Sequence, residues 1–138
     1  NVTGYRKIVD FKDRTSDAGA YVLGGEANFY PVQTGSGMPF AAGTPATFVL
    51  TRTAAGFVTG YVGGTARFQF DDATDQRAVF SAAPYFFVDD NAVSGEASAG
   101  WANYIAFYDG ALTADQVSAL QIPTAPTSTI PEPSTWAL

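Results

Sequence analysis

Residues 47–70 read TFVLTRTAAGFVTGYVGGTARFQF, and this stretch decides the expected fold. Two runs rich in β-branched and aromatic residues, TFVLTR and FVTGYV, are separated by the turn TAAG. Gly63 and Gly64 then fit a two-residue hairpin turn, because both positions tolerate a positive φ. Residues 65–70 alternate between apolar and polar side chains. The stretch therefore predicts three antiparallel strands with one face in water.

Further strand signals lie on both sides of this meander. Ile8–Phe11 is rich in apolar residues, and so is Ala20–Leu23 before a pair of glycines. We expect residues 27–30 to continue the same strand as Ala20–Leu23. The aromatic run Tyr85–Val88 is expected to form a buried strand. Trp101–Tyr108 alternates between two faces and predicts one more strand.

One short helix is expected after these strands. Thr113 is a favourable N-cap residue, and Gln116 three positions later completes a capping box. Val117 and Leu120 would then pack inward against the strands.

The length and composition fit one folded domain followed by a spacer. The chain has 138 residues, of which 46% are hydrophobic, so it can bury a sizeable core. From Pro123 onward, prolines alternate with Thr, Ser and Ala, which is typical of an extended linker. We expect an all-β sandwich over residues 1–122 and a Pro/Thr-rich spacer over residues 123–138.

Charge and residue types exclude several classes of function. The net charge of −6 at pH 7 disfavours binding to nucleic acid. The chain has no histidine and no cysteine, which removes Ser-His-Asp and Cys-His catalysis and most zinc, copper and haem sites. No apolar run approaches the roughly 18 residues of a membrane-spanning helix.

The last residues carry a recognisable motif. Ile130, Pro131, Glu132 and Pro133 are followed by STWAL after the Pro/Thr-rich spacer. This segment resembles the start of the PEP-CTERM sorting signal of Gram-negative bacteria. The resemblance implies a protein exported to the cell surface or the extracellular matrix, with an exosortase processing its precursor. The hydrophobic span and the Arg-rich end of such a signal do not follow here, so we expect a processed or cut chain.

A second resemblance concerns the folded part. The strand, turn and capped helix expected over residues 101–120 look like the end of a laminin-G-like, concanavalin A-like jelly roll. The meander of residues 47–70 and the segments 4–17 and 86–90 agree with that family in order and character. The resemblance implies an antiparallel jelly-roll β-sandwich.

Such domains usually begin with one or two strands before the point that matches Gly4. One interpretation is that a first strand is missing here, which leaves an unpaired edge that a strand from another molecule can fill. The other is a complete domain with an unrecognised first strand near Asn1.

The best candidate metal site is an acidic loop. Calcium needs several hard oxygen ligands, and a loop can wrap carboxylates and carbonyls around it. The resemblance adds to this, since domains of that family often hold a structural calcium. The four candidate Ca²⁺ ligands are Asp89, Asp90, Asn91 and Glu96. Asp13 or Asp17 would contribute from a neighbouring loop. The alternative is a solvated loop whose side chains cap turns.

Exposed aromatic rings are the candidates for glycan binding. Trp101 at a strand start and Tyr85 are the two assigned to this role, and ordinary core packing is the alternative. Glycosidase chemistry needs two carboxylates across a cleft, and the Glu-x-Asp-x-Glu arrangement of related glucanases does not occur here.

We therefore expect a non-catalytic surface or matrix domain that binds exopolysaccharide. Two alternatives stay open. One is a structural subunit of an extracellular filament or assembly that self-associates by strand exchange, and the other is a glucanase-type glycoside hydrolase.

Overall fold

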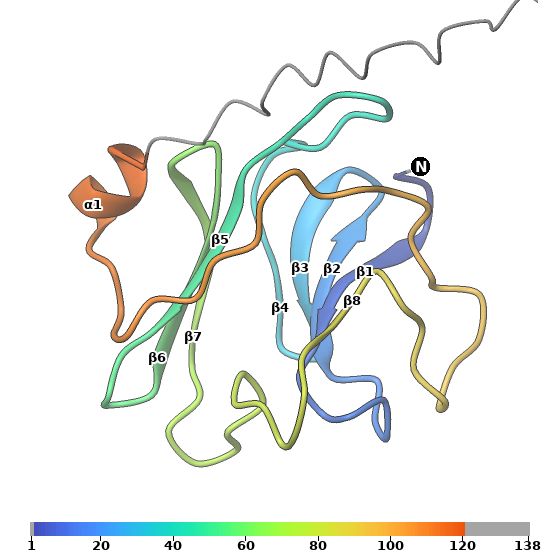
Figure 1. Cartoon of the computed structure of the whole chain (residues 1–138), viewed down its shortest axis with the longest axis horizontal. Helices are drawn as coiled ribbons and strands as arrows, with labels where there is room; N and C mark the ends of the chain where they lie inside the picture. Colours follow the sequence, from blue (N-terminus) through green and yellow to red (C-terminus); the bar gives the residue numbers. More distant parts are fainter. Residues whose placement is uncertain (1, 121–138) are drawn as a thin grey trace, which may run out of the picture.

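The computed structural model describes residues 2–120, which form two antiparallel sheets and one short helix (Figure 1). The five-stranded sheet has the order β4-β3-β2-β1-β8. Its strands are β1 Tyr5–Asp10, β2 Gly19–Leu23, β3 Glu26–Tyr30, β4 Gln33–Thr34 and β8 Tyr85–Phe86. The three-stranded sheet has the order β5-β6-β7. Its strands are β5 Phe48–Arg52, β6 Phe57–Val62 and β7 Thr65–Asp71, and the helix α1 spans Ala114–Ser118.

The meander predicted over residues 47–70 is confirmed as β5, β6 and β7. Val49 pairs with Tyr61, and β6 pairs with β7 along its whole length. Gly63 and Gly64 have φ values of 58° and 78°, so both occupy the left-handed region that this hairpin turn requires.

The five-stranded sheet corrects one sequence expectation. Residues 27–30 do not continue the strand at Ala20–Leu23, because the chain reverses at Gly24 and Gly25, whose φ values are 59° and 98°. The two runs are the separate strands β2 and β3, paired side by side as a hairpin. The paired glycines were the signal for this turn, as they were between β6 and β7.

The two sheets share one apolar core. The rings of Phe29 on β3 and Phe70 on β7 lie 4.7 Å apart, centroid to centroid. The buried core residues are Val9, Phe11, Ala20, Ala27, Phe29, Val58, Val62, Phe68, Phe70 and Ala78. Because both sheets contribute to this cluster, each sheet turns one face inward and one outward.

One side of the two-sheet structure is closed by hydrogen bonds. Gly35, directly after β4, donates its N–H to the carbonyl of Ala27 on β3, and Ser36 donates to the carbonyl of Arg67 on β7. The chain therefore joins both sheets along the β4–β7 side. We call the opposite side, where β5 faces β1 and β8, the open side.

The open side contains two departures from the sequence prediction. Tyr85–Val88 is not a buried strand: β8 has only two half-buried residues, and Phe87 leaves the strand with a φ of 61°. Trp101–Tyr108 is not a strand either, since no described strand lies beside it to pair with its backbone. Figure 1 shows this stretch as a coil that crosses from one sheet to the other before α1.

The helix prediction is confirmed in detail. The Thr113 hydroxyl accepts from the Gln116 N–H, and the Gln116 side chain accepts from the Thr113 N–H, so both halves of the capping box are present. Val117 is buried and Leu120 is half-buried. Within residues 2–120, no helix has the length and apolar character needed to cross a membrane.

Gly60 on β6 provides a test of the packing between β6 and β7. A Cβ at this position would lie 2.2 Å from the ring of the buried Phe68, which has no room to move away. We expect Gly60→Ala to lower the free energy of unfolding by about 1–3 kcal/mol in urea denaturation.

The matched control is Gly100→Ala, because a Cβ at Gly100 meets no atom within 4 Å. This variant should stay within about 0.5 kcal/mol of the unmodified chain. Equal stability of the two variants would contradict the close packing of Gly60 against the Phe68 ring.

Candidate functional site

A buried lysine lies on the outer face of the five-stranded sheet. Lys7 on β1 is opposite Tyr21 on β2, and the residue before Tyr21, Ala20, points into the core. Since neighbouring residues of a strand face opposite sides, Lys7 and Tyr21 point outward. Both are nevertheless fully buried, because the loop that follows β8 covers them.

The Lys7 ammonium is surrounded by oxygen atoms and one aromatic ring. Its Nζ atom donates a short hydrogen bond to Asp90 Oδ2 and lies 3.4 Å from Asp10 Oδ2. Asp17 Oδ1 is 4.0 Å away, and the ring centroid of Tyr21 is 4.7 Å away. A buried ammonium requires such partners, since removing an unpaired charge from water costs far more than folding can supply.

The covering loop is shaped by its own aspartates. Asp90 Oδ1 accepts from the N–H groups two and three residues later, at 2.7 and 2.9 Å. Asp89 Oδ2 accepts from the N–H groups of Gly95 and Glu96, at 2.6 and 2.9 Å. These bonds hold the loop in the turn that places Asp90 over Lys7.

The charge on Asp90 stabilises the folded chain. Burial alone would raise its pKa, but the hydrogen bonds from Lys7 and from two backbone N–H groups, together with the Lys7 charge, outweigh it and lower the pKa to about 2. A carboxyl with a lowered folded pKa contributes stability above its ordinary pKa of 3.8, and this contribution is lost as the pH falls toward 2.

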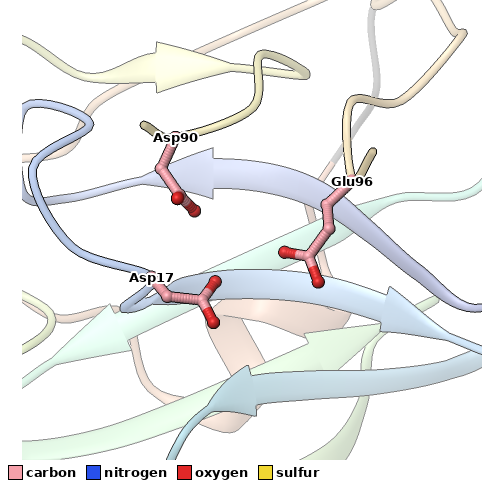
Figure 2. Close-up of side chains that lie close together, drawn as sticks. All are labelled: Asp17, Asp90 and Glu96. Carbon is pink, nitrogen blue, oxygen red and sulfur yellow. The ribbon is translucent and has the colours of Figure 1, made fainter. Parts of the chain in front are cut away.

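Glu96 and Asp17 complete an acidic triad with Asp90. One carboxylate oxygen of each lies within 4.8 Å of the others, and Figure 2 shows the Asp17 side chain meeting those of Asp90 and Glu96, which come from the loop after β8. Burial and the Asp17 charge raise the pKa of Glu96. Tyr21 donates a 2.5 Å hydrogen bond to Asp17, and burial followed by this bond raises the pKa of Tyr21.

The structure brings together only part of the predicted calcium set. Asp90 and Glu96 meet at the triad, and Asp17 joins them from the loop before β2 as expected. Asn91 instead accepts from the guanidinium of Arg14, at 3.3 Å. Asp89 is occupied on Oδ2 by backbone N–H groups, while its buried Oδ1 has no hydrogen-bond partner.

Lys7 is the member of the site that the sequence did not reveal. Four carboxyl groups, those of Asp10, Asp17, Asp90 and Glu96, share this single ammonium. The triad has the oxygen ligands that Ca²⁺ prefers, but the ammonium already lies among them. Because Lys7 Nζ lies 4.0 Å from Asp17 Oδ1 and bonds to Asp90, its positive charge would repel a divalent cation bound to the same oxygens.

A second acidic cluster, over residues 71–75, has a structural role. Asp72 is buried, with Oδ2 3.0 Å from Arg52 Nε and 3.0 Å from the N–H of Ala78. Its Oδ1 accepts from the N–H of Arg77 at 2.6 Å. This carboxylate joins β5 to the turn after β7.

Only one of the two glycan candidates borders the groove. Trp101 is 73% exposed and borders a groove of about 970 Å³ on the open side. The groove is apolar along much of its wall, with Phe40, Phe48, Leu50, Phe86 and Phe107 among its lining residues. Tyr85 does not line it: this residue pairs with Asp10 and interacts with Asp13, which raises the Tyr85 pKa through a hydrogen bond.

Comparisons of the chain with protein-family models, with curated proteins and with solved structures find no match in any of the three. The resemblances to the PEP-CTERM signal and to laminin-G-like domains are expectations from the sequence. The proposed function rests on the geometry of the described residues.

Lys7→Met should separate the roles of charge and packing at this site. The variant keeps an apolar side chain but leaves the carboxylates without their ammonium, so we expect a loss of about 3–5 kcal/mol of stability. Calcium should then raise the melting temperature of Lys7→Met by occupying the vacated place, and should leave the unmodified chain unchanged.

Lys12→Met is the matched control for this calcium effect, because Lys12 Nζ donates to two backbone carbonyls rather than to the triad. A calcium-induced rise in the melting temperature of the unmodified chain would show that the ammonium does not fill the cation position.

Glu96→Gln tests whether the negative charge of Glu96 destabilises the fold. Because the folded state raises the pKa of Glu96, the ionised side chain destabilises the fold at neutral pH. We expect Glu96→Gln to be more stable than the unmodified chain at pH 7, with the difference vanishing as the pH falls below the ordinary glutamate pKa of 4.5. Urea denaturation at several pH values measures this, with Glu26→Gln as the control because Glu26 lies on β3, outside the acidic triad.

Proposed function

We propose that this chain is a non-catalytic surface or matrix domain of an exported bacterial protein, and that its open side takes up an extended strand from another polypeptide. The proposal includes the jelly-roll connectivity, which two antiparallel sheets and the capped helix favour. It also includes export and exosortase processing through Pro131, Glu132 and Pro133, which lie outside the described residues.

The unpaired edge of β5 carries the proposal. Thr53 donates to the carbonyl of Phe57, and Gly63 donates to the carbonyl of Thr47. In an antiparallel pair the backbone groups alternate in direction, so the odd-numbered residues 47–53 face β6. The N–H and C=O groups of Phe48 and Leu50 consequently point away from β6, as do those of Arg52, and no described residue binds them.

The surroundings of this edge suit a strand. The side chains of Phe48 and Leu50 pack against the core from the open side. Across the groove, the backbone from residue 99 to residue 112 makes no backbone hydrogen bond with any described residue. An inserted strand would meet unpaired backbone on β5 and apolar side chains at alternate positions, which is the arrangement used in β-strand addition.

The acidic residues support a non-catalytic role. Asp10 and Asp90 contact the Lys7 ammonium, and Asp72 is bound by an arginine and backbone N–H groups. Each of these carboxylates holds the fold together. A glycosidase would instead need two carboxyl groups facing a substrate across a cleft.

Exopolysaccharide is the second candidate ligand, and the exposure of Trp101 favours it. An indole ring that is 73% exposed at the rim of a groove can stack on a sugar ring. The apolar groove wall and the unpaired β5 backbone favour the polypeptide strand over the polysaccharide, because sugars supply few apolar groups to fill such a space.

Hydrogen exchange with an added peptide tests strand uptake. An eight-residue peptide of alternating threonine and valine should slow amide exchange at Phe48, Leu50 and Arg52 by roughly tenfold or more. Val49 and Thr51 should change little, because their N–H groups already face β6. NMR resolves the individual amides.

The control peptide carries proline at all eight positions, so it lacks N–H donors on both of its edges. When the exchange is measured on the monomeric chain, equal effects of the two peptides, or no protection at Phe48 and Leu50, would contradict strand uptake. Binding to a polysaccharide array that Trp101→Ala abolishes would instead favour the glycan.

A further inference from the structure

We infer that the strand is supplied by a second copy of this chain: residues 101–108 of each copy add to the β5 edge of the other, which gives a symmetric dimer. This inference rests on the proposed strand uptake and names its partner. The chain carries both halves of the pairing, since an unpaired edge and an unpaired strand-like segment occur in one molecule.

The segment 101–108 has the properties of a donor strand. Its side chains alternate, with Trp101, Ile105 and Phe107 on one side of an extended backbone. Every residue from 99 to 111 is exposed, and the exposed fractions of Trp101 and Phe107 are 73% and 66%. Large apolar side chains in such a position are typical of a surface that another molecule covers.

The segment is fixed at both ends, and between them its backbone makes no hydrogen bond with any described residue. Before it, Ser98 donates its N–H to Phe87 and its hydroxyl to the carbonyl of Lys7, at 3.0 and 2.7 Å. After it, α1 is held on the second sheet by the buried Val117 and by a 3.3 Å bond from Ser118 to Gly64. The Phe107 ring also packs edge-on against Phe80 and Phe86, with centroids 6.1 and 6.4 Å apart. The stretch can therefore extend toward a partner without unfolding either sheet, at the cost of these two ring contacts.

Charge permits two copies to meet on this side. The chain carries a net charge of −6, so most of its surface repels a second copy. Residues 40–51 and 97–108, which contribute most of the groove wall, contain no charged residue. An uncharged patch neither attracts a charged partner nor repels the same patch on a second copy. Two copies can therefore meet there in spite of their net negative charge.

The available area suits a dimer. Aromatic side chains bury roughly 150–250 Å² each, so four that are half to three-quarters exposed offer about 500 Å² per copy. These four are Trp101, Tyr104, Phe107 and Tyr108. With Ile105 and the β5 edge added, the total approaches the roughly 800 Å² per partner of a stable interface. A two-fold axis would make the contact between the segment and the β5 edge occur twice in the dimer, as in an isologous interface.

Light scattering coupled to size-exclusion chromatography tests the inference on the full chain. We expect a mass of twice the 14.5 kDa chain, falling to the monomer on dilution. Ile105→Pro and Ala106→Pro each remove one N–H, and neighbouring N–H groups of a strand point in opposite directions. At least one of the two variants should weaken the dimer by about tenfold or more.

Ala106→Thr is the matched control, because threonine keeps the N–H and favours extended backbone. It should dimerise as the unmodified chain does. A dimer that survives both proline variants, or a chain that is monomeric at every concentration, would overturn the inference. If the monomer still shows peptide-induced protection at Phe48 and Leu50, strand uptake stands and only the self-pairing fails; without that protection, both fail.

Discussion

The buried ammonium of Lys7 is the interaction on which the arrangement of the outer face depends. It draws together carboxylates from β1, from the loop before β2 and from the loop after β8. Asp90 lies 83 positions away from Lys7 along the chain, so this contact closes a long loop. Because a lone buried charge is unfavourable, the covering loop has one acceptable position, over Lys7.

That position determines where the chain goes next. Once Ser98 is bound beside β1, the following residues must travel from the first sheet to α1 on the second. They cross the open side without a backbone hydrogen bond to any described residue. The loop after β8 covers the outer face of the five-stranded sheet. Its position therefore places the apolar segment 101–108, whose backbone is unpaired, along the groove. The acidic site and the groove are consecutive parts of one chain path.

Sequence patterns predicted the turns of the β5–β7 meander and the helix cap correctly. Features that depend on contacts between residues far apart in the sequence could not be predicted. The meander of β5–β7 and the Thr113 cap were predicted correctly because adjacent residues determine their turns and hydrogen bonds. The alternating pattern of residues 101–108 predicts which side chains would share a face if the backbone were extended. It contains no information on whether a neighbouring strand is present, and the predicted strand is not formed. Asp90 and Glu96 were identified from their loop. Lys7 was missed, since nothing near it in sequence indicates that distant carboxylates will cover it.

The β5 edge lacks the features that usually protect an edge strand. Proteins discourage unwanted pairing by placing lysines, prolines or inward-pointing charges on exposed edges. Here two of the outward-facing backbone positions, Phe48 and Leu50, carry apolar side chains, and the charge of Arg52 is engaged by Asp72. An unprotected edge beside a groove whose lining contains a single charged residue, Arg52, would promote association in any solution that contains a suitable strand. Such an edge is explained most simply if the folded, working form of the protein keeps it covered.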